Sequence, residues 1–458
     1  MSESALPHGA GTGSATVTHR RVLALAFPIV LANLTQPILG AVDTAVAGHL
    51  DGAQYLGGVA LGGLFFNFVF WGFGFLRMGT TGLVAQAHGA GDDAGIRLNL
   101  LRALIVAFAL GAAVLALQVP LLSFALTALG GSDAVRATAL AYSHARIWSA
   151  PFALANYVVL GYLLGVQRVR LALVAQVFIN AVNIGAVLLY VYGFGWGIAG
   201  IGAATATADA CGFALGAWML WRLRPRGLGP IAARALADRV ALKRLIVLNR
   251  DIFLRTLCLL GAFGWFAHLG AKQGDATLAA NALLLNFQTF MAYGLDGFAH
   301  AAEALVGAAA GARDRNAFRQ AVRVTLFWSA LGALLFALVY WAAGGWIVAR
   351  LTDQAEIRAV ALRYLPWAAI SPIVSVWGFL LDGVFIGATQ TQSLMRAMVV
   401  SFSIFIAATL AVGTFGNHGL WFALLLFMAA RGATLARYLP GLLRRIGADA
   451  HAAPAARA

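Results

Sequence analysis

Residues 22–48 read VLALAFPIVLANLTQPILGAVDTAVAG, and this stretch decides the class of fold. It is long enough to cross the hydrocarbon core of a bilayer, which takes about 20 apolar residues in a helix. Its one ionisable side chain is that of Asp43. A charge at the centre of a membrane helix costs roughly +2.5 to +3.5 kcal/mol. We therefore expect Asp43 to face a protein interior and to take part in moving ions, protons or substrate.

The same apolar character extends over the whole chain. Hydrophobic residues make up 61% of the 458 residues, charged residues only 11%, and the mean hydropathy is +0.82. A soluble protein of this length would not sustain such a composition, so we predict an all-α polytopic membrane protein. Apolar segments long enough to span a bilayer predict about twelve helices, at 22–48, 55–76, 99–126, 135–165, 168–193, 196–222, 243–271, 278–310, 319–349, 357–388, 393–414 and 418–443.

The net charge of +15 at pH 7 could indicate nucleic-acid binding, but its distribution indicates membrane topology instead. Basic residues gather in alternate connections, from Arg20 and Arg21 to Arg444 and Arg445, with the largest group at 222–244. Cytoplasmic loops of membrane proteins carry such an excess of lysine and arginine. The pattern predicts a multi-pass membrane protein with both termini in the cytoplasm, and no nucleic-acid partner. Arginine greatly outnumbers lysine, as in proteins from GC-rich bacterial genomes, so we expect the bacterial inner membrane.

The two halves of the sequence resemble each other at a constant offset. Gly72 and Gly294 lie 222 residues apart, and the same offset joins further identical pairs. These are Gly48 with Gly270, Leu83 with Leu305, Val84 with Val306, Gly89 with Gly311, Asp92 with Asp314, Gly161 with Gly383 and Gly165 with Gly387. A repeat of six helices returns the chain to its starting side, so the halves should be related by a pseudo-twofold axis along the membrane normal.

The repeat sets the expected division of the chain. We expect a disordered tail at 1–18, an amino-terminal lobe at 19–222, a cytoplasmic linker at 223–242, a carboxy-terminal lobe at 243–445 and a second disordered tail at 446–458. Transporters built from two such repeats bind substrate between them and alternate the side to which the site opens.

The positions of the two cysteines and the lack of a nucleotide-binding motif in the sequence give no indication of a cofactor. Cys211 and Cys258 both fall inside predicted spans, which argues against a disulfide framework, and no metal-ligand spacing occurs in the sequence. No Walker motif occurs either. We therefore expect no metal and no cofactor, with energy from an ion gradient rather than from ATP bound to this chain.

Four separated motifs carry a resemblance to a known family. They are PILGAVDTAVAGHL at 37–50, NRDIFLRTL at 249–257, LDGFAHAAEALVG at 295–307 and LDGVFIGATQT at 381–391. In this order they resemble the multidrug and toxic compound extrusion (MATE) transporters, in particular their DinF-like branch. The resemblance implies two six-helix lobes in a V shape and export driven by a proton or sodium gradient.

The resemblance also implies a polar pocket in the amino-terminal lobe. Its residues match Asp43 on the first helix, Asn180 and Asn183 on the fifth, and Thr205 and Asp209 on the sixth. The chain departs from the family at residue 187. A valine stands there where the branch commonly has an aspartate, which weakens the expectation of a sodium site.

Helix geometry gives an independent reason to group these residues. Asn180 and Asn183 are three apart, and Thr205 and Asp209 are four apart, so each pair shares a helix face. Burial and a nearby negative charge both favour the protonated form of a carboxyl group. Our hypothesis is that Asp43 binds and releases the exchanged proton and that Asp209 alters the proton affinity of Asp43.

Two prolines lie in the first predicted helix, Pro28 and Pro37. A proline removes one backbone hydrogen bond and kinks a helix, so Pro37 should free the carbonyl of Asn33 near Asp43. The resemblance gives Pro28 the role of a protonation-dependent hinge. The alternative is a static kink.

The carboxy-terminal lobe is predicted to hold its own charged cluster. It comprises Asp251, Arg255, Asp296, Glu303 and Asp382, all within predicted spans. An intramembrane arginine needs partners, so we expect an ion-paired cluster around Arg255. Two interpretations remain open, a structural lock of this lobe and a second coupling or gating site.

The leading functional hypothesis is a secondary antiporter, not an enzyme, that exports amphipathic or cationic organic compounds in exchange for protons. The alternatives are a sodium-coupled exporter and a lipid-linked precursor flippase of the same superfamily. A flippase would need a strongly cationic cavity, to which Arg77 and Arg146 could contribute if they point inward. We expect a monomer in the lipid bilayer with a small-molecule substrate as its ligand.

Overall fold

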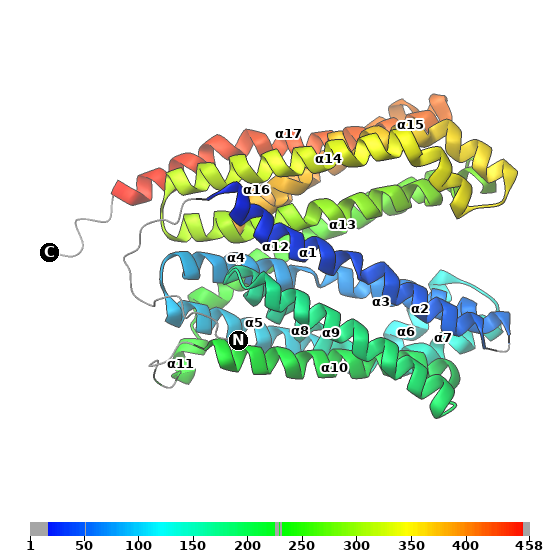
Figure 1. Ribbon diagram of the computed structural model, residues 1–458, viewed down its shortest axis with the longest axis horizontal. Helices are drawn as coiled ribbons and strands as arrows, with labels where there is room; N and C mark the ends of the chain where they lie inside the picture. The colour runs from blue at the N-terminus through cyan, green and yellow to red at the C-terminus, as the bar shows by residue number, and fades with distance from the viewer. Residues whose placement is uncertain (1–16, 51, 225–228, 230, 452–458) are drawn as a thin grey trace.

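The computed structural model describes residues 17–50, 52–224, 229 and 231–451. Within these residues all regular structure is helical, and the helices form two bundles that lie side by side along the long axis (Figure 1). Most of the two predicted disordered tails, at 1–16 and 452–458, lies outside the described residues. The last helix, however, continues to His451, into the segment predicted as the second tail.

The amino-terminal half forms one bundle. It comprises α1 (His19–Leu34), α2 (Gln36–Gly48), α3 (Ala53–Gly72), α4 (Phe75–Gly89), α5 (Asp93–Ala116), α6 (Gln118–Leu129), α7 (Asp133–Arg146), the short η1 (Ile147–Ser149), α8 (Ala150–Gly165), α9 (Val169–Leu188), the π-helical turn η2 (Leu189–Gly193) and α10 (Gly197–Leu223).

The carboxy-terminal half forms the other bundle, after the short α11 (Ala233–Leu236). It comprises α12 (Arg239–Ala271), α13 (Asp275–Gly311), α14 (Arg315–Leu351), α15 (Ala355–Gly387), α16 (Thr391–Ala411), the short η3 (Gly413–Phe415) and α17 (Gly416–His451). The predicted linker at 223–242 therefore contains α11 and the first turn of α12.

Eleven helical segments of the described residues are long and apolar enough to cross a membrane. The helix α13 is not among them, although it has 37 residues. It carries Asp296, His300 and Glu303, which lower its hydropathy, and it packs against α4, α14 and α15. A polar membrane helix of this kind is tolerated where protein surrounds it, so the predicted multi-span architecture of about twelve helices is confirmed.

Several spans of the amino-terminal half are made of more than one helix. The first span is interrupted at Thr35, the second at Phe73 and Gly74, and the third at Leu117. The fourth passes through the turn η1, and the fifth ends in the π-helical turn η2. The apolar pattern continues through Phe73 and Gly74, so hydropathy alone could not locate that break, whereas Thr35, Gln36 and Pro37 interrupt the pattern at the first one.

The internal repeat is visible in the helix boundaries. The helices α5 and α14 begin at Asp93 and Arg315, and α8 and α15 end at Gly165 and Gly387, each pair 222 residues apart. Backbone conformation repeats too: Gln167 and Thr389, at the same offset, have φ of 60° and 53°. Non-glycine residues rarely adopt positive φ, so their agreement supports a true structural duplication.

The two halves meet most closely where α4 crosses α13. A Cβ added at Gly89 would lie 1.9 Å from the carbonyl oxygen of Ala308, and one added at Gly311 would lie 1.9 Å from that of Gln86. These two contacts are exchanged by the 222-residue offset. Glycine is needed here because only a residue without a side chain allows such close backbone approach. The crossing, which we call the α4–α13 crossing, lies towards the end of the molecule at which α4 and α13 end (left in Figure 1).

The helix α1 contacts both halves of the molecule. Its first turn lies against α14, where His19 accepts a hydrogen bond from the Trp328 indole at 3.1 Å, and its length packs on α13. Near its end, the Asn33 side chain donates to the carbonyl oxygen of Tyr293 at 3.2 Å. After the break at Thr35, α2 packs against α3 and α9 of the amino-terminal half. The first span therefore links the carboxy-terminal half to the segment that carries Asp43.

Candidate functional site

Asp43 lies on α2 and is buried, with 8% of its surface exposed. Its Oδ1 atom is enclosed and has no hydrogen-bond partner among the described residues. The charged group that acts on it through space is the guanidinium of Arg146, at the end of α7. A buried carboxylate oxygen without a partner is costly, so this atom is a candidate for binding a proton or a ligand.

The two asparagines on α9 connect neighbouring elements. The Asn180 side-chain amide donates to the hydroxyl of Thr35 at 2.7 Å, which ties α9 to the break between α1 and α2. One turn further, the Asn183 amide donates to the Thr205 hydroxyl on α10 at 3.1 Å, and the Asn183 Oδ1 atom is buried without a partner among the described residues. The predicted grouping of Asn183 with Thr205 is therefore present.

Asp209 lies on α10, one turn beyond Thr205, and is half-buried. Its backbone carbonyl accepts a hydrogen bond from the Asn156 amide at 3.0 Å. As for Asp43, the charged group that acts on it is Arg146. We call the set Thr35, Asp43, Arg146, Asn180, Asn183, Thr205 and Asp209 the amino-terminal polar cluster.

Arg146 was not placed in this cluster by the sequence analysis, which named it only as a possible contributor to the cationic cavity of a flippase. One of its terminal nitrogens donates to the Tyr142 hydroxyl, and its guanidinium lies 4.7 Å from the centre of the Phe66 ring. Its Nε is buried without a partner among the described residues. Its position inside the predicted span 135–165 was the available signal, because an intramembrane arginine is as unusual as an intramembrane aspartate.

Val187 lies on the same helix as the two asparagines and is fully buried. It belongs to an apolar cluster that also contains Val46, Tyr142 and Ile201. The position at which the related branch commonly has an aspartate is thus filled by hydrocarbon, and it offers no oxygen to a cation.

The two prolines have different surroundings. The helix α1 continues through Pro28, whereas Pro37 lies in the first turn of α2, directly after the break. A proline is tolerated in the first turn because the missing N–H has no partner there. At the break, the Thr35 N–H turns back to the Ala32 carbonyl at 3.2 Å. The predicted kink at Pro37 is therefore a separation into two helices.

The predicted carboxy-terminal cluster is divided into separate groups. Asp382 accepts hydrogen bonds from Arg255 and from Arg431, the latter at 2.6 Å. Asp251 pairs with its neighbour Arg250 at 2.8 Å rather than with Arg255, and accepts a bond from the Thr391 hydroxyl at 3.3 Å. The sequence analysis missed Arg431, although it lies inside the predicted span 418–443.

Glu303 makes its ion pair across the two halves. Arg77 on α4 donates to its carboxylate at 3.0 Å, and both side chains are buried. The charges that act on Asp296, one further residue of the predicted cluster, include those of Arg77 and Arg255. The Arg77–Glu303 pair, which we call the cross-half ion pair, could not be inferred from spacing because its members are 226 residues apart.

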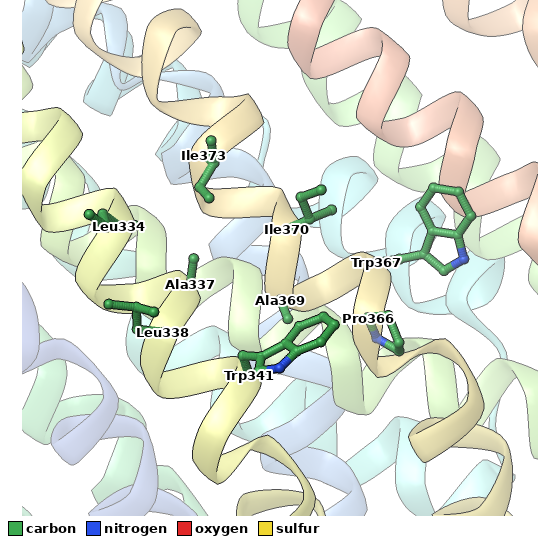
Figure 2. Close-up of a pocket in the computed structure, with 9 residues that line it drawn as sticks. All are labelled: Leu334, Ala337, Leu338, Trp341, Pro366, Trp367, Ala369, Ile370 and Ile373. Carbon is green, nitrogen blue, oxygen red and sulfur yellow. The ribbon is translucent and has the colours of Figure 1, made fainter.

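A crevice between α14 and α15 is a different kind of site. Its volume is ≈ 450 Å³, and Figure 2 shows its lining. The nine lining residues are apolar or aromatic: Leu334, Ala337, Leu338, Trp341, Pro366, Trp367, Ala369, Ile370 and Ile373. Several of these are widely exposed on the side of the bundle. Such a surface suits lipid and offers no charged group for coupling, so the candidate site is the amino-terminal polar cluster.

Comparison with known proteins agrees with this architecture. The MatE family model matches residues 28–191 and 254–434, one segment in each half. The chain belongs to the MATE family of membrane transporters. It is therefore a multi-pass membrane transporter of small molecules and not an enzyme, as the sequence predicted.

Curated relatives place the chain near one bacterial protein. It is 43% identical over 413 residues to the DNA damage-inducible protein F of Escherichia coli, covering 90% of each chain. It is 27% identical to a probable multidrug resistance protein NorM of Rhizobium meliloti, covering 96% of each chain. The resemblance to the DinF-like branch is thus confirmed.

Solved structures share the fold. A MOP superfamily transporter from Pyrococcus furiosus, described as having a binding pocket of reversed polarity, superposes with a TM-score of 0.83 at 17% identity. The match covers 94% of this chain and 96% of that one. An outward-facing structure of a multidrug resistance MATE transporter superposes with a TM-score of 0.82 at 18% identity over the same shares.

Proposed function

We propose that this MATE transporter is a secondary antiporter that exports amphipathic or cationic organic compounds in exchange for protons. The observation that carries the proposal is Asp43, a buried carboxylate with an unpartnered oxygen on a segment next to a helix break. Relatives named as multidrug resistance proteins support the substrate class.

The exchange follows from competition at Asp43. A deprotonated carboxylate attracts a cationic substrate, and a protonated one releases it, because two positive charges cannot be neutralised by one negative charge. Asp209 tunes the exchange through Arg146, which acts on both carboxylates. Asn180, Asn183 and Thr205 complete the pocket as hydrogen-bonding groups.

Alternating access requires the halves to rock about their contact. In this structure they are held together by the α4–α13 crossing and the cross-half ion pair. The first span links the halves through its break at Thr35, so a change at Asp43 can be transmitted to α1 and α13. Pro37 lies directly after this break and Pro28 lies within the continuous α1 before it, and we assign both the role of hinge.

Protons suit this site better than sodium. A dehydrated Na⁺ wants several oxygen ligands, and the fully buried Val187 removes one carboxylate from the expected set. We place the basic connections, including the linker 223–242, and both termini in the cytoplasm of a bacterium. The functional unit is then a monomer with an amino-terminal lobe at 19–222 and a carboxy-terminal lobe at 243–445.

The carboxy-terminal charges fit a structural role better than a second coupling site. Asp382 is enclosed by Arg255 and Arg431, so its charge is already compensated. The cross-half ion pair is the exception, because rocking of the halves would disturb it. Arg77 and Arg255 are both engaged with carboxylates, so of the bases considered for a flippase cavity Arg146 alone has no ion pair among the described residues, which is a poor match for the pyrophosphate of a lipid-linked precursor.

The test uses purified protein in liposomes with a fluorescent cationic dye such as ethidium. Proton and sodium gradients are imposed separately. Dye movement driven by the proton gradient alone is expected. Movement driven by sodium alone would overturn the coupling assignment, and no movement under either gradient would overturn the proposal and favour the flippase.

A further inference from the structure

A groove lies between the beginnings of α1 and α9, on the outer side of the amino-terminal half. Its volume is ≈ 570 Å³, and its lining residues are Arg20, Leu23, Ala24, Phe27, Pro28 and Arg170. The two helices pack against each other. In addition, the Arg21 guanidinium donates to the Gln167 side chain at 2.8 Å, two residues before α9 begins. The groove is therefore formed by two helix ends that contact each other.

The groove lies at the end of the molecule at which α4 ends. The helix α9 follows α8, and a Cβ added at Gly165, the last residue of α8, would lie 2.8 Å from the Val84 side chain on the second half of α4. The charges of Arg21 and Arg168 are close enough to act on His88, at the end of α4. We have placed the basic connections at this end in the cytoplasm, so the groove faces the cytoplasmic leaflet of the bilayer.

The two arginines of the groove are available to a ligand. Arg20 and Arg170 are exposed, and neither belongs to an ion pair of the described residues. Residues 1–16, which precede α1 in the chain, contain a single acidic residue, Glu3. The adjoining chain thus has little negative charge to offer these two guanidinium groups.

The surface next to the arginines is apolar. Phe27, about two turns after Arg20 on α1, is 63% exposed, and Val174, about one turn after Arg170 on α9, is 52% exposed. Leu23 and Ala24 line the groove between these positions. Basic pockets between membrane helices on the cytoplasmic side bind anionic lipid headgroups. A soluble anion would contact the arginines and leave the apolar lining unused, whereas a lipid matches both parts.

We propose that the groove between α1 and α9 binds an anionic phospholipid of the cytoplasmic leaflet. The phosphate group lies between Arg20 and Arg170, and an acyl chain lies along Leu23, Ala24 and Phe27. The crevice between α14 and α15 differs, because its lining has no charged residue and selects no headgroup. This inference goes beyond the proposed function and does not depend on which ion drives transport.

The test measures lipid binding to the detergent-purified protein by native mass spectrometry. Phosphatidylglycerol is compared with phosphatidylcholine that has the same acyl chains. The double variant Arg20→Gln/Arg170→Gln removes the two charges, and Ala24→Trp fills the groove. The control Arg315→Gln/Arg319→Gln removes two exposed arginines at the beginning of α14, outside the groove. A phosphatidylglycerol with a photoreactive acyl chain then locates the site by peptide mapping.

We expect the wild type to bind phosphatidylglycerol about tenfold or more tightly than phosphatidylcholine, because two arginines favour the anionic headgroup. The groove double variant should lose this preference, and the control should keep it. Ala24→Trp should weaken the binding of phosphatidylglycerol and remove crosslinks to residues 20–28 and 170–178.

Three results would overturn the inference. Equal affinity of the wild type for the two lipids would show that the groove does not select an anionic headgroup. Equal loss of preference in the groove double variant and in the control would show a general attraction to the basic surface, as would crosslinks confined to other helices. Displacement of the lipid by an equal concentration of glycerol 3-phosphate, which lacks acyl chains, would show a site for a soluble anion.

Discussion

The two halves of this transporter share their helix boundaries but differ in continuity. The segment at 53–89 is two helices, α3 and α4, whereas its counterpart 222 residues later is the single helix α13. The same contrast separates α5 and α6 from α14. Prolines do not explain the difference, since α15 contains Pro366 and Pro372 and remains unbroken. The helices of the amino-terminal half are therefore broken at positions where their counterparts in the carboxy-terminal half are continuous.

The halves also differ in how they treat buried charge. In the carboxy-terminal half Asp382 is held by two arginines, whereas in the amino-terminal half Asp43 and Arg146 form no ion pair. Breaks in membrane helices leave backbone groups free and are tolerated only where protein or water satisfies them. The comparison teaches that the carboxy-terminal half keeps continuous helices and pairs its buried aspartate with arginines, whereas the amino-terminal half has broken helices and leaves Asp43 without an ion pair.

The largest expected effect comes from Asp382→Asn. Losing this carboxylate leaves Arg255 and Arg431 buried without their anion, and breaking a buried pair typically costs about 3–5 kcal/mol. We expect a large fall in thermal stability in detergent. Asp43→Asn, which breaks no ion pair, should leave the unfolding temperature near that of wild type. Equal destabilisation by the two variants would remove the distinction between the halves.

The cross-half ion pair should have the next largest effect. Glu303→Gln leaves Arg77 without a carboxylate at the contact between α4 and α13. We expect the conformation in which α4 and α13 are in contact to lose about 2–4 kcal/mol of stability. Spin labels on exposed residues at the ends of α4 and α13 should then report longer distances. Unchanged distances in Glu303→Gln would mean that the pair does not hold the halves together.

The α4–α13 crossing is tested by Gly89→Ala. The added Cβ would overlap the Ala308 carbonyl, so the two helices must move apart at a cost of about 1–3 kcal/mol. We expect slower gradient-driven transport. Gly264→Ala is the control. Gly264 lies on α12 in the carboxy-terminal half, and a Cβ added there would meet no atom within 4 Å. It should transport normally and be slightly more stable, since alanine favours helix.

The smallest effect is expected at the hinge. Pro28→Ala restores a backbone donor within the continuous part of α1 and should add at most about 1 kcal/mol of stability. If α1 moves about this residue, the transport rate should fall several-fold while dye binding is kept. A normal rate in Pro28→Ala would assign the hinge to the break at Thr35 alone.

Much of the fold follows from the sequence. The multi-span architecture and the repeat could be predicted, because they depend on hydropathy and a constant offset. The second span was predicted too short, at 55–76, since its helical segment continues to Gly89. The placement of Asn183 beside Thr205, on two different helices, was expected only from the family resemblance. The helix break at Phe73 and Gly74 could not be predicted, since these residues continue the apolar pattern. It is set by packing between distant segments.

The ion-pair partners of the buried charges were the second feature that the sequence could not predict. Arg255 is four residues after Asp251 on one helix, yet its bond is to Asp382, on α15. Glu303 likewise has a partner in the other half. Which helix faces which determines these pairs, and spacing along one helix carries no such information. Arg431 went unassigned, and Arg146 was not linked to Asp43, for the same reason, although their presence inside spans marked both as candidates.

The central claim is that Asp43 carries the exchanged proton, and proton release on substrate binding tests it most directly. Rhodamine B ethyl ester, a permanent cation, is titrated into purified protein in a weakly buffered solution that contains a pH indicator. The account predicts proton release from the wild type, close to one per bound dye, and almost none from Asp43→Asn. Undiminished release from Asp43→Asn at saturating dye would contradict the account.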